Sequence, residues 1–197
     1  MAAGDFSCFL YAEFDILIPW QSLVAWAGDA DTLASMGFQR SFYRVEYTPW
    51  NGQQASTDNE HPVCLEHYNK TVHVADGTHH QNFIQLPNSY CAVWIASKVQ
   101  LTKFQASSAW HSQQEAPWGI REMAASGFHF VDVPPGFDTA GVVPYDVDSQ
   151  LLTRDAAVWH VSNNYCGAHV SASSPDSIAG GCSVLIKDML NGSIGQA

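Results

Sequence analysis

The first twenty residues alternate between apolar and mixed positions. Every even position from 6 to 18 is apolar, which is the period of two typical of a β-strand: Phe6, Cys8, Leu10, Ala12, Phe14, Ile16 and Ile18. The odd positions combine polar and apolar residues, so a neighbouring segment is expected to cover part of the second face. Because the run is longer than an ordinary strand, we expect it to bend before it ends at Pro19.

Further short segments predict strands because they are rich in aromatic and β-branched residues. They are SFYRVEY (41–47), VCLEHY (63–68), TVHVA (71–75), QNFIQL (81–86), SYCAVWIASKVQLTKF (89–104), FHFVDV (128–133) and AAVWHVS (156–162). The dipeptide Asn69-Lys70 suits the turn of a hairpin between 63–68 and 71–75. The segment SVLIKDML (183–190) is compatible with either strand or helix.

Helices and long loops occupy less of the chain. The spacing of apolar residues in 20–37 suits one or two short helical turns, and APWGIREMAASG (116–127) predicts a helix. Prolines and turn residues predict long surface loops at 131–150 and 170–181. Eight or nine strands with so little helix predict an all-β protein, a single domain over residues 1–197 with the form of a β-sandwich or jelly roll.

Charge and composition narrow the function classes. Charged residues make up 14% of the chain, against about 25% in a typical domain. The net charge is -11 and no basic run is present, which disfavours nucleic-acid binding through a basic arm. No secretory signal and no membrane-length apolar run are visible, so we expect a soluble protein of the cytoplasm or of a virion. Five cysteines without metal spacing indicate free thiols in a reducing compartment.

The stretch LEHYNKTVHV (65–74) is the first candidate for chemistry. A turn at Asn69-Lys70 would place Glu66 opposite His73 on the wet face and His67 on the other face. Glu66 and His73 could then bind zinc, iron or manganese with help from further histidines. Those histidines are His61, His79 or His80. The set resembles the histidine-and-glutamate metal site of cupin barrels, without their two histidines one residue apart, and the alternative is an exposed polar pair.

Cys166 is the second candidate. The fragment Tyr165-Cys166-Gly167 resembles the nucleophile turn of viral chymotrypsin-like cysteine proteases, although Asn164 and Ala168 replace two glycines of that pattern. The resemblance implies a cysteine hydrolase in which Cys166 is the nucleophile. One of His61, His67 or His73 would then be the base. The alternative is an ordinary free thiol beside a loop.

Three tryptophans form the third candidate. Trp50, Trp110 and Trp118 lie in predicted loops or near helix ends, where an exposed indole suits a protein interface or stacking on a sugar. The alternative is that they fold back as caps on the domain.

The function that these observations favour is non-enzymatic packing or recognition, as a coat, shell or attachment component of a virus-like particle. Expected partners are copies of the chain or other shell proteins, and glycans if the tryptophans bind sugars. No cofactor is expected, although a divalent transition metal would fit the histidine site. The alternatives are a carbohydrate-binding lectin, a metal-dependent β-barrel enzyme and a cysteine hydrolase.

Overall fold

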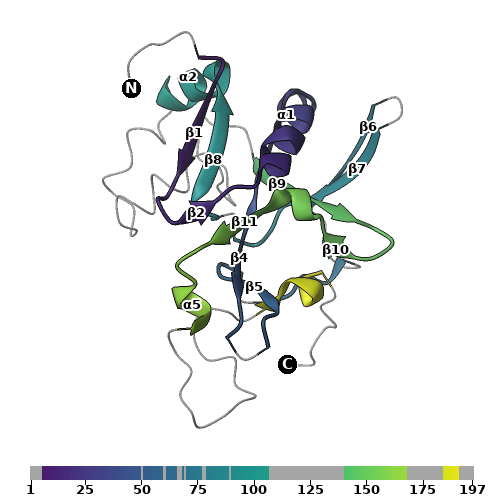
Figure 1. Ribbon diagram of the computed structural model, residues 1–197. Coiled ribbons are helices and arrows are strands. Elements are labelled where there is room, and N and C mark those ends of the chain that lie inside the picture. Colours follow the sequence, from purple (N-terminus) through teal and green to yellow (C-terminus); the bar gives the residue numbers. More distant parts are fainter. Residues whose placement is uncertain are drawn as a thin grey trace.

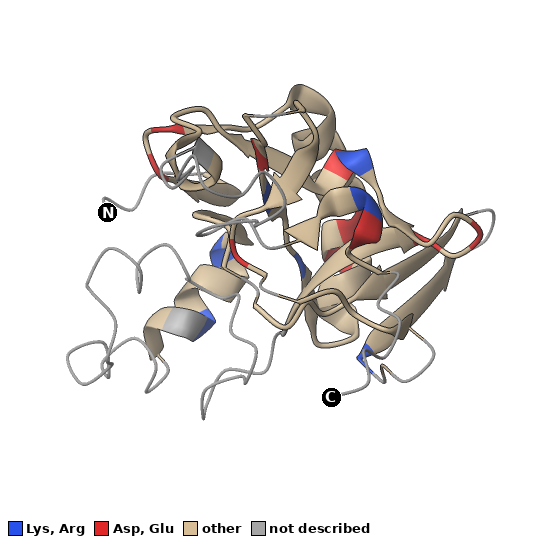
Figure 2. Cartoon of the chain, turned by 90° about the horizontal axis from the view of Figure 1, so that it is seen from below, with Lys and Arg blue, Asp and Glu red and all other residues tan. Residues whose placement is uncertain are grey.

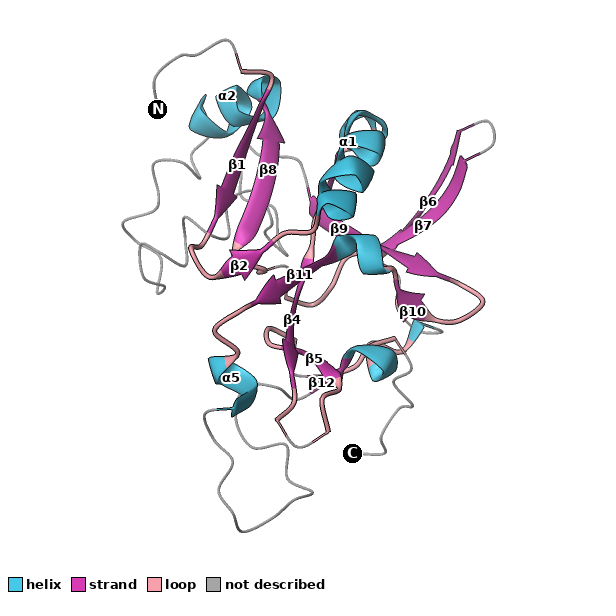
Figure 3. Ribbon diagram, viewed as in Figure 1, coloured by secondary structure: helices cyan, strands magenta, loops and turns pink. Residues whose placement is uncertain are grey.

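Strands dominate the computed structural model (Figure 1). It describes residues 6–49, 51–59, 61–65, 68, 70–76, 79–88, 90–106, 140–167 and 184–190. These residues form two five-stranded sheets and one two-stranded sheet, with three α-helices around them (Figure 3). The predicted all-β fold class is confirmed.

The first five-stranded sheet contains the centre of the molecule. Its order is β12 (Val184–Leu185), β5 (Gln54–Ser56), β4 (Tyr43–Tyr47), β11 (Ala157–His160) and β2 (Ile16–Leu17). The central pair, β4 and β11, is parallel, and the other pairs are antiparallel. Both faces of β4 are buried, which leaves only Tyr47 exposed in that strand.

The second five-stranded sheet is built around β9. Its strands are β10 (Leu151–Leu152), β9 (Ala140–Asp146), β7 (His79–Ile84), β6 (Thr71–Asp76) and β3 (Phe38–Arg40), which pairs with β9 in parallel. Only Ser41 and Phe42 separate β3 from β4, so one continuous run of chain passes from this sheet into the first.

The two-stranded sheet pairs β1 (Cys8–Ala12) with β8 (Val93–Ser97), and α2 (Lys98–Ala106) follows β8 directly. The long N-terminal strand predicted from the sequence is therefore split. A turn at residues 13–15 separates β1 from β2, and the two strands join different sheets.

Helix α1 (Trp20–Ser35) links the sheets. It begins after Pro19 and ends where Gly37 adopts a positive φ of 82°, a conformation that glycine tolerates without strain. Its buried residues Ser22, Trp26 and Leu33 follow helical spacing on one side. Trp26 joins a cluster with Phe42, Val93, Ile95 and Val158, whereas Leu33 joins one with Val74, Phe83 and Val142.

The main hydrophobic core contains residues from both five-stranded sheets. Tyr43 and Val45 of β4 meet Ile84 of β7 and Val143 and Tyr145 of β9, which accounts for the alternation of the β4 sequence on this face. The opposite face of β4 carries Arg44 and Glu46, which are also buried. This second face contains the polar cluster described below.

Several predicted elements differ from the structure. The segment 20–37 forms one 16-residue helix and not one or two short turns, because its apolar residues pack on two separate clusters. The predicted strand at 89–104 ends at Ser97 and continues as α2. The predicted loop at 131–150 contains β9, in which Pro144 lies opposite Phe83.

The remaining elements are short. They are η3 (Arg154–Ala156), α5 (Asn164–Gly167) and η4 (Ile186–Asp188). The segment 183–190 thus contains both a strand and a helical turn. The predicted helix at 116–127, the strand at 128–133 and the loop at 170–181 lie outside the described residues. No helix in the described part of the chain has both the length and the apolar character to cross a membrane.

Candidate functional site

The histidine hairpin has a different register from the predicted one. Strand β6 pairs with β7, and the turn between them follows Asp76, so it does not lie at Asn69-Lys70. His73 is therefore opposite Asn82, and the ring nitrogen Nδ1 of His73 lies 2.9 Å from the Asn82 amide oxygen. The rings of His73 and His80 stack with centroids 6.0 Å apart. The hairpin prediction was wrong because it placed the turn at Asn69-Lys70, before β6, whereas the hairpin turn follows β6.

The proposed metal ligands are only partly described. His61 and His73 are exposed, and Glu66 lies outside the described residues. His79 is in β7, but its side chain is not described. Among the residues whose side chains are described, no three histidine, cysteine, aspartate or glutamate side chains converge to hold a metal ion. The metal site stays a prediction.

The structure describes four of the five cysteines, but none of the three candidate tryptophans. Cys166 is buried and disulfide-bonded, so in this form it has no thiolate to act as a nucleophile. Cys8 and Cys64 are free thiols, and burial raises the pKa of the Cys91 thiol to about 11. The candidate sugar-binding residues lie outside the described part of the chain: Trp50, Trp110 and Trp118.

A polar cluster lies between β2, β4 and β11, with Glu46 and His160 buried, Asp15 partly buried and Ser162 exposed. We define it by Asp15, Glu46, His160 and Ser162. Glu46 is completely buried, and its Oε1 forms a hydrogen bond with Nδ1 of His160. On the other side of the ring, Nε2 lies 2.8 Å from Asp15 Oδ2 and 2.8 Å from Ser162 Oγ. Ser162 Oγ also donates to Asp15 Oδ2 at 3.1 Å.

The chain reaches this cluster through a turn after β11. Asn163 has a positive φ of 47°, which asparagine tolerates better than most residues. Its side chain accepts from Tyr47 N at 2.7 Å and donates to Tyr47 O at 3.0 Å, so it fixes the turn to the end of β4. The first residues of α5 then follow, and the amides of Tyr165 and Cys166 donate to the Glu46 carboxylate at 3.3 and 2.6 Å.

A buried ion pair adjoins the cluster on the same face of β4. The Arg44 guanidinium donates to both carboxylate oxygens of Asp58, at 3.0 and 2.6 Å. It also lies 5.1 Å from the ring centroids of both Tyr90 and Tyr165. Burial lowers the pKa of Arg44, but the attraction and hydrogen bonds of Asp58 outweigh it, so the pKa rises. Arg44 therefore stays charged inside the protein.

The electrostatics of Asp15 follow the same logic. Burial raises the pKa of this carboxyl group, but hydrogen bonds from His160 and Ser162 and the attraction of His160 together lower it below the usual value. Asp15 is thus held as an anion beside the His160 ring. The ionised form is the one that both neighbours stabilise.

The geometry of Ser162, His160 and Glu46 has the connectivity of a serine hydrolase triad. In such a site the histidine nitrogen nearest the serine must accept the serine proton. Here Asp15 Oδ2 faces the same nitrogen at the same distance of 2.8 Å and competes as an acceptor for any proton on it. The nearest helical amides, Tyr165 N and Cys166 N, already bind Glu46 and cannot form an oxyanion hole. The cluster is therefore better suited to holding three strands together than to acyl transfer.

The N-terminal segment and the first residue of α1 expose several large apolar side chains. Phe14 is 96% exposed and Trp20 is 75% exposed. More than half of the surface of Phe6, Leu10 and Leu17 is also exposed. We call these five residues the N-terminal apolar surface. Phe6 and Leu10 of the predicted even-numbered side thus face outward, whereas Ala12, Ile16 and Ile18 pack against a core cluster.

The charges of this segment are already engaged within the chain. Tyr90 Oη donates to Glu13 Oε1 at 2.9 Å, and Asp15 belongs to the polar cluster. Among the described strands, β1 pairs only with β8 and β2 only with β11, so each has one open backbone edge. The surface combines apolar side chains, open strand edges and few competing charges. These are properties of an interface.

Sequence reasoning missed the polar cluster of Asp15, Glu46, His160 and Ser162. The alternation of SFYRVEY places Arg44 and Glu46 on one face of the strand, but it does not indicate that this face is buried. A histidine at the end of a buried strand and an aspartate within the first strand were the available signals, and nothing in their spacing joins residues more than 100 positions apart. The exposed surface was also missed, although its apolar pattern was noted.

Comparisons with known proteins provide no relatives. The chain matches no protein-family model, no curated protein and no solved structure.

Proposed function

We propose that the protein is a non-enzymatic packing and recognition protein, and specifically a coat, shell or attachment component that contacts other copies of its own chain. The observation that carries the proposal is the exposure of the N-terminal apolar surface. Large exposed apolar areas on a folded protein mark interaction sites. Phe14 and Trp20 are the side chains of this surface that a partner would bury to the greatest benefit, because aromatic residues dominate interface energies.

A second copy is the partner that this surface fits. Both acidic residues of the segment, Glu13 and Asp15, are engaged in hydrogen bonds within the chain, which reduces charge repulsion between two identical surfaces. The open edges of β1 and β2 could pair with the same edges of a second copy about a two-fold axis. The low content of charged residues supports close packing of many copies.

The test is native mass spectrometry of the full chain, its Phe14→Ser/Trp20→Ser variant and the control Val147→Ser. Val147 is exposed and apolar, but it lies in the turn between β9 and β10. We expect the natural chain and the control to form a large closed oligomer, and the double variant to remain a monomer.

The outcomes separate the two parts of the proposal. A small symmetric oligomer that the double variant loses would support recognition through this surface and contradict the coat assignment. A monomer at every concentration for the natural chain, or an oligomer unaffected by the double variant, would contradict the whole proposal.

A further inference from the structure

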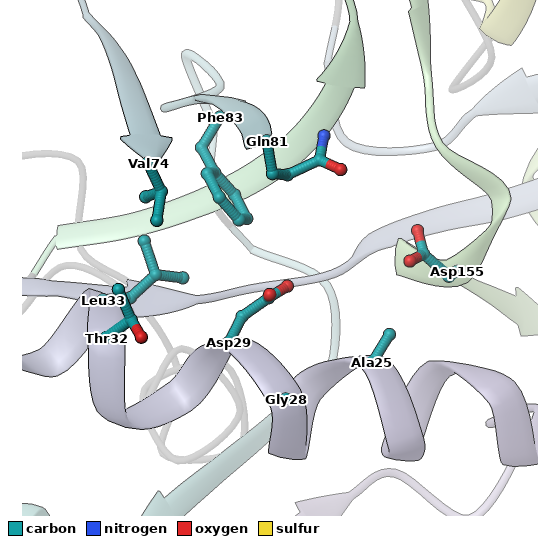
Figure 4. A pocket seen from close by; sticks show the side chains of 9 residues that line it. All are labelled: Ala25, Gly28, Asp29, Thr32, Leu33, Val74, Gln81, Phe83 and Asp155. Carbon is teal, nitrogen blue, oxygen red and sulfur yellow. The ribbon is translucent and has the colours of Figure 1, made fainter. Parts of the chain in front are cut away.

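A cavity of about 280 Å³ lies between α1, the β6–β7 hairpin and η3 (Figure 4). Asp29 rises from the helix into this space, Phe83 points down from β7, and Gln81 extends toward the side where Asp155 lies. The residues that line the cavity are Ala25, Gly28, Asp29, Thr32, Leu33, Val74, Gln81, Phe83 and Asp155. Gly28 is exposed, so the cavity opens to the surface beside it.

One side of the cavity is apolar. Leu33, Val74 and Phe83 belong to a single hydrophobic cluster and are almost completely buried. Their side chains offer a surface for an aliphatic or other apolar part of a ligand. Most small-molecule sites combine such a surface with a few convergent polar groups.

The polar side of the cavity presents mainly hydrogen-bond acceptors. Asp29 and Asp155 contribute carboxylates. The Gln81 side-chain nitrogen donates to Asn82 O and Tyr145 O, both at 3.1 Å, which leaves the Gln81 carbonyl oxygen as the group that can face a ligand. A ligand that complements this side must supply several donors.

The charge of the site is negative. Arg40, which is 1% exposed, forms ion pairs with both Asp29 and Asp155. One guanidinium thus faces two carboxylates, which leaves one net negative charge in this group. No lysine or arginine is among the residues that line the cavity. A cation is therefore favoured over a neutral or anionic ligand.

Gly28 keeps the entrance open. It lies in the interior of α1, where glycine is less favourable than alanine. A β-carbon at this position would meet no heavy atom within 4 Å. The packing of the chain therefore does not require glycine here, whereas a larger side chain would extend into the space that a ligand must cross.

We propose that this cavity binds an alkylammonium group, carried by a lysine side chain of a partner protein or by a free aliphatic amine. The aliphatic stem packs on Leu33, Val74 and Phe83. The ammonium group has three donors and no acceptor, which matches the carboxylates of Asp29 and Asp155 and the Gln81 carbonyl oxygen. This site is separate from the N-terminal apolar surface and does not depend on the assembly proposed above.

The test is isothermal titration calorimetry of the full chain at low ionic strength with three probes. The probes are n-butylamine, lysine blocked at both its α-amino and carboxyl groups, and n-butanol. We expect an amine to bind at least about tenfold more tightly than n-butanol, because charge-assisted hydrogen bonds are stronger than neutral ones. If blocked lysine binds more tightly than n-butylamine, the ligand is a lysine side chain. If only n-butylamine binds, the ligand is a free amine.

Variants locate the binding site. Gly28→Leu is expected to fold with an unchanged or higher melting temperature and to lose amine binding, whereas Gly28→Ala retains it. Asp155→Asn should weaken binding about tenfold, and Asp31→Asn, on the same helix but outside the cavity, should change it less than about twofold. Equal binding of n-butanol and amine, no heat with either amine, or full binding by Gly28→Leu would overturn the proposal.

Discussion

The buried face of β4 and the N-terminal apolar surface distribute polarity in opposite ways. The β4 face encloses Arg44 and Glu46, both almost fully removed from water. The N-terminal surface leaves Phe14 and Trp20 in water. A folded chain ordinarily does the reverse in both places. The buried charges therefore need polar partners, and the exposed aromatic side chains need an apolar partner.

The two regions differ in whether the chain itself supplies the contacts that offset a buried charge or an exposed apolar side chain. Each buried charge of the β4 face has its partners inside the chain, with Asp58 for Arg44 and His160 for Glu46. The apolar side chains of the N-terminal surface have no such cover within the described residues. The buried charges of the first region are thus paired in the isolated chain, whereas the apolar side chains of the second would be covered by the partner that we propose.

The largest expected effect follows from breaking the Arg44–Asp58 ion pair. Arg44→Met leaves the Asp58 carboxylate buried without its partner, and we expect a loss of about 3–5 kcal/mol in the free energy of unfolding. Urea denaturation measures this loss. The exposed control Arg154→Met should change stability by less than about 0.5 kcal/mol.

A second substitution tests whether the loss comes from the unpaired charge of Asp58. In Arg44→Met/Asp58→Leu both charges are replaced by apolar groups, and most of the lost stability should return. A double variant as unstable as Arg44→Met would show that the ion pair contributes through its shape and not through its charge.

A smaller effect is expected for the pH dependence of Asp15. Because its pKa in the folded protein lies below the usual value of 3.8, Asp15 stabilises the fold above this pH. This contribution is lost as the pH falls through the lower pKa of the folded state. We expect Asp15→Asn to cost about 1 kcal/mol at neutral pH and progressively less under acid conditions.

Urea denaturation between about pH 6 and about pH 2 measures the difference between the natural chain and Asp15→Asn. The control is Asp31→Asn on the exposed part of α1. A cost for Asp15→Asn that stays constant at every pH would contradict the assignment of Asp15 as an anion held by His160 and Ser162.

The smallest effect on folding is expected at the N-terminal apolar surface. At a protein concentration low enough for a monomer, Phe14→Ala should change the free energy of unfolding by less than about 0.5 kcal/mol. The matched substitution Phe42→Ala, at a residue that is 1% exposed, should cost about 3–5 kcal/mol. Comparable losses for the two phenylalanines would mean that Phe14 packs against the fold and is not an interface residue.

The sequence predicted those strands whose own residues carry a clear strand pattern. β4 and β11 were recognised from aromatic and β-branched residues, and these strands lie at the centre of the sheet. β9 was missed because Pro144 and Gly141 indicate a loop, whereas its pairing with β3, β7 and β10 determines its conformation. The end of β8 was missed because the alternation of apolar residues continues into α2.

The candidate sites were harder to predict than the strands. Asp15, Glu46 and His160 come from three distant segments, and only the order of strands in the sheet brings them together. Likewise, the cavity beside α1 combines a helix, a hairpin and the residue Asp155, and no local pattern indicates a space between them. Lysine and arginine lie on several different elements of the described chain (Figure 2).

The two parallel pairings have a consequence for the order of folding during synthesis. Residues 38–40 pair with residues 140–142, and residues 43–45 pair with residues 157–159. Each of these contacts closes a loop of roughly a hundred residues, which is slow compared with local pairing. We therefore expect the N-terminal half to emerge from the ribosome without its central partners and to depend on chaperones until β11 has been translated.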